Sequence, residues 1–192
     1  TRFRLQLDLL GVPFQYVTGY NSNSTARLAL ERNEIQFFTE GTPAFHSMVT
    51  PNLVKSGLVI PLYHDELVSA EGEVRASADA PGISTFAQLY QALHGKPPSG
   101  ILWESLKVVN FGQAMQRHAA LPPGSPPQAV AELKQAFAAM LKDSSFVEEF
   151  QRVTKTFPRY TIGPEGDKLA KKIAQAPAEV KNTVRQYTEV KK

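Results

Sequence analysis

The first 64 residues alternate between two hydrophobic patterns. Three short runs are rich in β-branched and aromatic residues and have the composition of strands, at residues 14–17, 35–38 and 58–63. Helix-forming residues fill 25–32 and 44–55, the second with a break expected near Pro51. A further helix is predicted at residues 2–10, ending at Gly11. Strands that alternate with helices in this way indicate an α/β sheet.

The middle of the chain begins with a polar stretch without periodicity, residues 64–81, which is expected to form a surface loop. A helix is predicted next, at residues 84–93, because its apolar residues share one face: Phe86, Leu89, Tyr90 and Leu93. Ser84 or Thr85 can cap its first turn, and Gly95 would stop it.

The strongest break in the chain is the proline cluster at residues 122–127. Two helices are predicted to follow it and to pack together through apolar stripes, formed by Val130, Leu133, Phe137, Met140 and Leu141 and by Phe146, Val147, Phe150 and Val153. Helices at 164–174 and 178–190 complete a helical tail. The chain is therefore expected to divide into an α/β lobe at residues 1–121 and a C-terminal helical segment at 122–192.

Composition narrows the class of protein. The chain has 192 residues, of which 42% are hydrophobic and 20% charged, so it can bury a core and is not expected to be disordered. Its formal net charge of +3 is smaller than nucleic-acid binders normally show. The absence of cysteine excludes disulfides, thiolate metal sites and cysteine nucleophiles. No apolar run approaches the roughly 20 residues of a membrane-spanning helix, so we expect a soluble chain.

Motifs of catalysis and of metal binding are not recognisable in the sequence. The four histidines lie 18, 30 and 24 positions apart, so no two have the spacing of a metal-binding pair on a helix. A nucleophile elbow and a phosphate-binding loop are both missing, and the adjacent acids Glu148 and Glu149 are not a matched acid and base. We therefore expect neither an enzyme nor a chain with a metal ion or a cofactor.

The C-terminal tail is basic, because residues 152–192 hold ten basic and four acidic side chains. Its lysines are spread over several helix faces without interleaved aromatic residues. This pattern favours a solvated surface over a nucleic-acid or lipid partner.

One polar loop, at residues 18–25, runs from the carboxyl end of a predicted strand into the start of a predicted helix. Free backbone N–H groups and the positive end of the helix dipole suit such a place to a carboxylate or a phosphate. The alternative interpretation is that Ser22, Ser24 and Thr25 only cap the helix.

A second polar turn, at residues 39–42, follows the next predicted strand, and such turns line one crevice in an open α/β sheet. The two turns are therefore candidates to share one ligand. Glu40 would repel an anionic ligand unless it met an ammonium, a hydroxyl or a water, and simple solvent exposure is its alternative role. The candidate ligand-binding residues are Thr18, Gly19, Tyr20, Ser24, Thr25, Glu40 and Thr42.

Four short motifs follow one another along the chain: YVTGY at residues 16–20, LALERNEI at 28–35, PGISTF at 81–86 and LPPGSP at 121–126. In order and spacing they resemble the substrate-binding receptors of tripartite tricarboxylate transporters. Lys142 and Asp143 fit the Lys-Asp pair of the family's C-terminal helices. The chain departs from the family at residues 33–36, where NEIQ replaces a Gly-x-Val/Ile-Asp pattern, which indicates a divergent branch.

The resemblance implies a type II periplasmic-binding-protein fold, in which two α/β lobes close over a ligand like a Venus flytrap. This chain is similar to the second lobe and the C-terminal helices, and nothing in it resembles the N-terminal lobe. By the same resemblance the protein would be a periplasmic receptor, with no signal peptide present in this chain, that passes a small organic acid to membrane transporter subunits. Backbone N–H groups around Thr18, Gly19, Tyr20 and Ser24 would hold one carboxylate of that acid.

Two other classes of protein remain open. One is a cytoplasmic effector-binding regulatory domain of the same architecture, as in LysR-type transcription regulators, which would need a DNA-binding segment that this chain does not contain. The other is an orphan receptor fragment that acts as an interaction module, bound to a missing lobe or to itself. Exposed apolar surface would favour this last interpretation.

Overall fold

Helices make up most of the structure, a computed structural model that describes residues 1–69, 71, 73–115 and 118–189. The helices are α1 (Arg2–Leu10), α2 (Asn23–Glu31), α3 (Thr42–Ala44), the π-helix η1 (Phe45–Val54), α4 (Phe86–His94), α5 (Ile101–Ala114), α6 (Pro127–Met140), α7 (Ser144–Thr154), α8 (Pro164–Ala174) and α9 (Ala178–Thr188). Strands β1 (Leu67–Val68) and β2 (Val74–Arg75) form a small antiparallel sheet. The fold is thus mainly helical, with one two-stranded sheet in the described residues.

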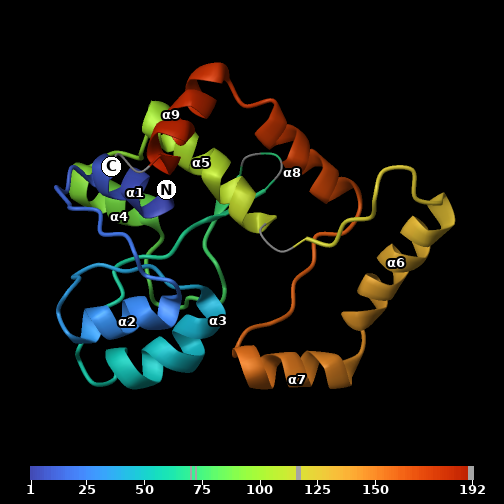
Figure 1. Ribbon diagram of the computed structural model, residues 1–192, viewed down its shortest axis with the longest axis horizontal. Coiled ribbons are helices and arrows are strands. Elements are labelled where there is room, and N and C mark those ends of the chain that lie inside the picture. The colour runs from blue at the N-terminus through green and yellow to red at the C-terminus, as the bar shows by residue number, and fades with distance from the viewer. Residues whose placement is uncertain (70, 72, 116–117, 190–192) are drawn as a thin grey trace.

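Helix α5 holds the fold together, because α1, α8, α9 and β1 all contact it (Figure 1). The main cluster of buried residues joins α5 to α1 and α4 and consists of Leu5, Phe86, Trp103 and Leu106. Farther along α5, Phe111 packs against Leu169 of α8 in a second, smaller cluster. Both clusters therefore depend on the same helix.

The first and last helices are tied to each other beside α5. Arg4 of α1 donates a hydrogen bond of 2.8 Å to the backbone oxygen of Tyr187, and its guanidinium lies 5.5 Å from the centre of the Tyr187 ring. The Tyr187 hydroxyl donates to Asp8, and partial burial together with this carboxylate raises the pKa of Tyr187 to about 12. The two ends of the described chain consequently lie close together (Figure 1).

The predicted helices are present near their predicted positions. In α4, the Thr85 hydroxyl accepts from the backbone N–H of Gln88 while the Gln88 side chain accepts from the N–H of Thr85, which forms a capping box. Gly95 ends α4 in the left-handed conformation, with φ of 71°. The break predicted near Pro51 is wrong, because η1 continues through this proline as a π-helix.

The sheet predicted from residues 14–17, 35–38 and 58–63 is not formed by the described residues, and this part of the α/β prediction is wrong. Aromatic side chains of two of these runs do lie near each other, since the ring centres of Phe37 and Tyr63 are 6.4 Å apart. A strand needs a neighbour that takes up its N–H and C=O groups, and these runs meet no such neighbour in the described chain. The predicted loop at residues 64–81 instead contains β1 and β2.

Helices α6 and α7 do not form the packed pair that their apolar stripes predict. They lie at a steep angle to each other at the edge of the structure (Figure 1), and neither contains a buried residue. Phe137 of α6 instead contacts Tyr160, with 5.5 Å between the ring centres, and Phe146 contacts Phe150 within α7. The apolar side chains of α6 and α7 therefore make small separate contacts and do not form a common core.

Replacing Phe86 with alanine tests the importance of the main cluster. Phe86 is fully buried and packs face to face with Trp103, so we expect Phe86→Ala to lower the free energy of unfolding by about 3–5 kcal/mol. Leu93→Ala, at an exposed position of the same helix, is the control and should change it by less than about 0.5 kcal/mol. Urea unfolding followed by circular dichroism measures both, and similar losses in the two variants would contradict the assignment of the core.

Candidate functional site

The first of the two predicted polar loops ends in a well-formed helix cap. The Ser22 hydroxyl accepts from the N–H of Thr25 at 3.3 Å, and the Thr25 hydroxyl accepts from the N–H of Ser22 at 3.2 Å. The hydroxyls of Ser22 and Ser24 are also 2.8 Å apart. Ser22 and Thr25 therefore cap α2, while the N–H groups of Asn23 and Ser24 make no backbone hydrogen bond within the described part of the chain.

The second polar turn reaches this cap through Glu40. One carboxylate oxygen of Glu40 accepts from the Asn23 side-chain amide at 2.6 Å and from the backbone N–H of Gly41 at 2.9 Å. The other oxygen forms an ion pair with the Arg27 guanidinium. The side chains of Glu40 and Arg27 are only 6% and 16% exposed, so the pair is largely shielded from water. The two turns therefore meet, although the sheet whose strand ends were expected to bring them together is not formed by the described residues.

Asn23 and Arg27 are the residues of this site that the sequence interpretation missed. They lie four positions apart on α2 and so present an amide and a guanidinium on one helix face. This spacing is visible in the sequence, but the residue that they hold, Glu40, is thirteen positions beyond Arg27. The positive charge beside Glu40 is therefore that of Arg27, a side chain of the same chain.

The other candidate residues are less closely joined to this cluster. Thr18 and Gly19 are exposed, and Gly19 has a φ of 106°, a conformation that a residue with a side chain rarely adopts. Tyr20 is half-buried. Thr42 is the first residue of α3 and follows Gly41 directly. Among the described residues, no side-chain hydrogen bond joins Thr18, Tyr20 or Thr42 to the cluster. The structure thus joins Glu40 to Asn23, the residue that precedes Ser24 and Thr25 in the first turn of α2, and no side-chain hydrogen bond ties the remaining candidates to this cluster in the described chain.

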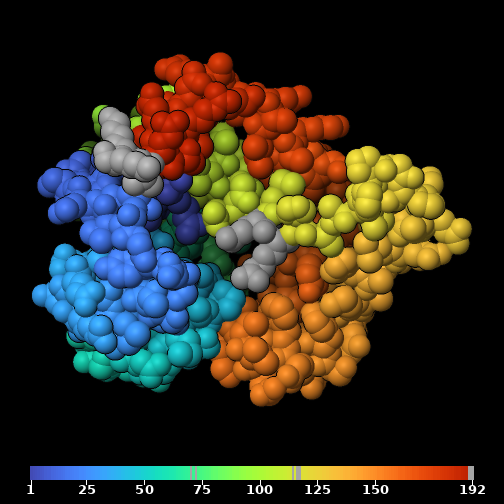
Figure 2. Space-filling model, viewed as in Figure 1, coloured from blue at the N-terminus to red at the C-terminus, as the bar shows by residue number. Residues whose placement is uncertain are grey.

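Two surface hollows lie away from the Glu40 cluster. One, of about 220 Å³, runs along η1 and is lined by Phe45, His46, Thr50, Val54, Pro61, Ala80, Pro81 and Ile83. The Thr50 hydroxyl there is buried without a hydrogen-bond partner in the described structure. None of the seven candidate residues lines this hollow, although α2, α3 and η1 gather at one end of the molecule (Figure 2).

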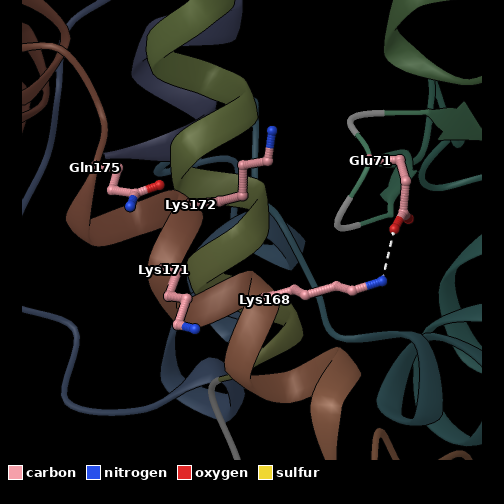
Figure 3. A pocket seen from close by; sticks show the side chains of 5 residues that line it. All are labelled: Glu71, Lys168, Lys171, Lys172 and Gln175. Atoms are coloured by element: carbon pink, nitrogen blue, oxygen red, sulfur yellow. Dashed lines mark hydrogen bonds and ion pairs between the residues drawn. The ribbon is translucent and has the colours of Figure 1, made fainter.

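The other hollow, of about 350 Å³, lies on α8 and is lined by Glu71, Lys168, Lys171, Lys172 and Gln175. Lys168 reaches across to Glu71 with 3.1 Å between nitrogen and oxygen, and this contact raises the pKa of Lys168. Figure 3 shows that the three ammonium groups point away from one another. The lysines therefore do not converge on a single small anion.

Glu66 is a buried carboxyl group outside these hollows. One of its oxygens accepts from the backbone N–H of Ala87, in the first turn of α4, at 2.5 Å. Its other oxygen is buried without a hydrogen-bond partner in the described structure. Burial is the main cause that raises the pKa of Glu66 above its ordinary value.

Neither a metal-binding cluster nor a membrane-spanning helix is found among the described residues. No group of three or more His, Asp or Glu side chains is placed to hold a metal ion. No helix there combines the length and the apolar character that crossing a membrane requires.

Comparison with known proteins identifies no relative of this chain. The chain matches no protein-family model, and no significant match is found among curated proteins or solved structures. The resemblance to transporter receptors therefore depends on the short motifs alone.

Removing the Arg27 guanidinium should reveal how much the Glu40 cluster stabilises the fold. Arg27→Ala leaves a largely buried carboxylate without its cation, and we expect a loss of about 1–3 kcal/mol in the free energy of unfolding. Arg32→Ala removes an exposed pair with Glu34 from the end of the same helix and should cost less than about 1 kcal/mol. Urea unfolding measures both variants, and an equal effect would show that the Glu40 cluster is not shielded.

Glu66 should make stability depend on pH. Because its pKa is raised in the folded chain, the folded state holds a proton that the unfolded state releases once the pH passes about 4.5, the ordinary value. The stabilising contribution of this proton is complete below that pH and is lost as the pH rises through the folded-state pKa. The unfolding free energy of Glu66→Gln, measured by urea unfolding at a series of pH values, should therefore rise relative to wild type as the pH increases above 4.5.

The control for this measurement is Glu132→Gln, on the exposed surface of α6. Its unfolding free energy should follow the wild-type curve at every pH. Parallel curves for wild type and Glu66→Gln would contradict the assignment of a raised pKa to Glu66.

Proposed function

We propose that this chain is part of a periplasmic solute-binding receptor of the tripartite tricarboxylate transporter type, which captures a small organic carboxylate for a membrane transporter. The proposal includes a type II periplasmic-binding-protein fold, of which the chain would supply the second lobe and the C-terminal helices. Its main support is one observation. Where the two predicted polar turns meet, Asn23 and Arg27 of α2 hold a carboxylate, that of Glu40.

The chemistry of this cluster suits a carboxylate ligand. An amide and a guanidinium on one helix face provide charge-assisted hydrogen bonds of the kind that recognise carboxylates. The N–H groups of Asn23 and Ser24, in the first turn of α2, are available beside them. The ligand carboxylate would accept hydrogen bonds from these two backbone N–H groups, at the positive end of the helix dipole.

Glu40 gives the proposed site its selectivity. Since its carboxylate already occupies Asn23 and Arg27, a second carboxylate beside it would be repelled unless the ligand also offers a donor. A hydroxyl or ammonium group on the ligand can donate to Glu40 while the ligand carboxylate faces the helix. We therefore expect a hydroxy acid or an amino acid rather than a plain dicarboxylate.

A thermal-shift panel tests the proposed ligand class. It would contain di- and tricarboxylates with and without hydroxyl groups, aromatic acids and amino acids, with the intact mass of the protein measured in parallel. A ligand at about 100 times its Kd stabilises the folded state by about 2.7 kcal/mol, which gives a clear shift. Binding of a hydroxylated or amino carboxylate supports the proposal, and the absence of any shift across the panel overturns it for this chain.

Glu40→Gln should change the choice of ligand. The neutral amide no longer repels a plain dicarboxylate and accepts less strongly from an ammonium, so we expect the preference for hydroxy or amino acids to fall by about tenfold, or about 1.4 kcal/mol. Glu34→Gln, an exposed change near the end of α2, is the matched control. Isothermal titration calorimetry on each variant measures the preference, and unchanged selectivity in Glu40→Gln removes this residue from the ligand site.

The interaction module is a second candidate function, and a specific observation favours it. Large apolar side chains are strongly exposed at several places, including Ile60, Leu93 and Phe157. Surface of this kind marks sites where a protein meets a partner when the side chains are contiguous.

A further inference from the structure

The hollow that runs along η1, of about 220 Å³, is lined mainly by apolar side chains and is called the η1 hollow below. One wall comes from η1 and includes Phe45 and Val54, and the other comes from Pro61 and the segment around Pro81. Among the described residues, no Asp, Glu, Lys or Arg side chain lines it. Because an ionised ligand group is costly to bury without a charged partner, the η1 hollow suits an uncharged molecule.

The size of the η1 hollow fits a molecule with a single ring. A cavity of about 150 Å³ between apolar side chains is large enough to hold benzene. A volume of about 220 Å³ can therefore hold an aromatic ring with one small substituent. Phe45, Pro61 and Pro81 supply apolar contacts for such a ring.

The π-helical backbone brings the lining residues of η1 onto one face. Its hydrogen bonds run between residues five positions apart, so side chains four or five positions apart share a face. Phe45, Thr50 and Val54 have this spacing. In an α-helix, Phe45 and Thr50 would point about 140° apart and could not line the same hollow. π-Helical turns are rare and are frequent at functional sites, which favours a ligand here.

His46 provides a hydrogen-bond acceptor at the η1 hollow. Its Nε2 lies within hydrogen-bond distance of the backbone oxygen of Asp79. Since a carbonyl oxygen only accepts, Nε2 carries the proton, and Nδ1 of the neutral ring is an acceptor. This Nδ1 stays accessible and makes no hydrogen bond in the described part of the chain. A ligand that donates a hydrogen bond can therefore use it.

The wall opposite η1 supplies no competing donor. Pro61 and Pro81 have no N–H group. The N–H groups of Ala80 and Ile83 already donate to backbone oxygens of their own loop. The donor that meets His46 must then come from the ligand.

This wall is also fixed in place without a ligand. The contact between His46 and Asp79 holds the loop against η1. On its other side, the Asp79 carboxylate pairs with Arg159, with 3.2 Å between oxygen and nitrogen. The η1 hollow is thus formed in advance, as sites for small molecules usually are.

We propose that the η1 hollow binds a small uncharged molecule with one aromatic ring and a hydroxyl group, which is the chemistry of a phenol. The ring would pack between η1 and the two prolines, and the hydroxyl would donate to Nδ1 of His46. The proposal goes beyond the carboxylate receptor and does not rest on it, because none of the seven candidate carboxylate-binding residues lines the η1 hollow.

A titration with phenol, followed by ¹H–¹⁵N correlation NMR, tests the site directly. We expect dose-dependent shifts of the backbone amides of Phe45, Thr50 and Ile83, with a Kd of about 0.1–5 mM for so small a ligand. The amides of Leu93 and Phe157, whose exposed apolar side chains lie outside the hollow, should not move comparably. Comparable shifts at these positions, or none at the hollow with phenol at about 5 mM, overturn the proposal.

Toluene is the matched comparison, because a methyl group of similar size replaces the hydroxyl. Toluene is the more apolar molecule, so a hollow without a hydrogen bond would bind it more tightly than phenol. We expect phenol instead to bind at least about threefold more tightly, through its hydrogen bond to His46. Equal or tighter binding of toluene overturns the proposal.

His46→Phe keeps a ring at this position and removes the acceptor. We expect its preference for phenol over toluene to be lost, while toluene still binds. His94→Phe, at an exposed position of α4, is the matched control and should keep the wild-type preference. An unchanged preference in folded His46→Phe overturns the proposal, and the toluene comparison on the unmodified chain decides the matter if this variant does not fold.

Discussion

The burial of α5 is the constraint on which the rest of the structure depends. Helices α1, α4, α8 and α9 have only nine to eleven residues each, and helices of this length are marginal in water without tertiary contacts. Their apolar faces reach a core because α5 offers Trp103 and Leu106 on one part and Phe111 on another. Helices α6 and α7 contribute no residue to either of these buried clusters, and neither helix contains a buried residue.

The Glu40 cluster shows how one contact can position two distant turns. Glu40 links α2 to the start of α3, because one of its oxygens accepts from Asn23 and from the N–H of Gly41 while the other pairs with Arg27. A carboxylate that is mostly shielded from water is stable only with such partners. The cluster therefore fixes the geometry of the turns and sets the charge that any ligand there would meet.

Local signals in the sequence were sufficient for most of the helices, but they did not identify α5 and were insufficient for the sheet. The Thr85 cap and Gly95 define α4 within ten residues, so its position follows from the sequence. A strand has no such local definition, because its hydrogen bonds depend on a neighbour, and residues 58–63 have the composition without the neighbour. The role of Arg27 was not predicted for a related reason, because only the path of the intervening chain brings Glu40 beside it.

The tie between the first and last helices affects how the molecule would respond to force. Because Arg4 and Tyr187 join α1 to α9 on one side of α5, tension applied to the two ends loads this tie before the core. Hydrogen bonds and ring contacts would then break one after another, as in a zipper, rather than all together in shear. A chain with ends so placed should yield at low force, and its helices should peel from α5 in order from the two ends.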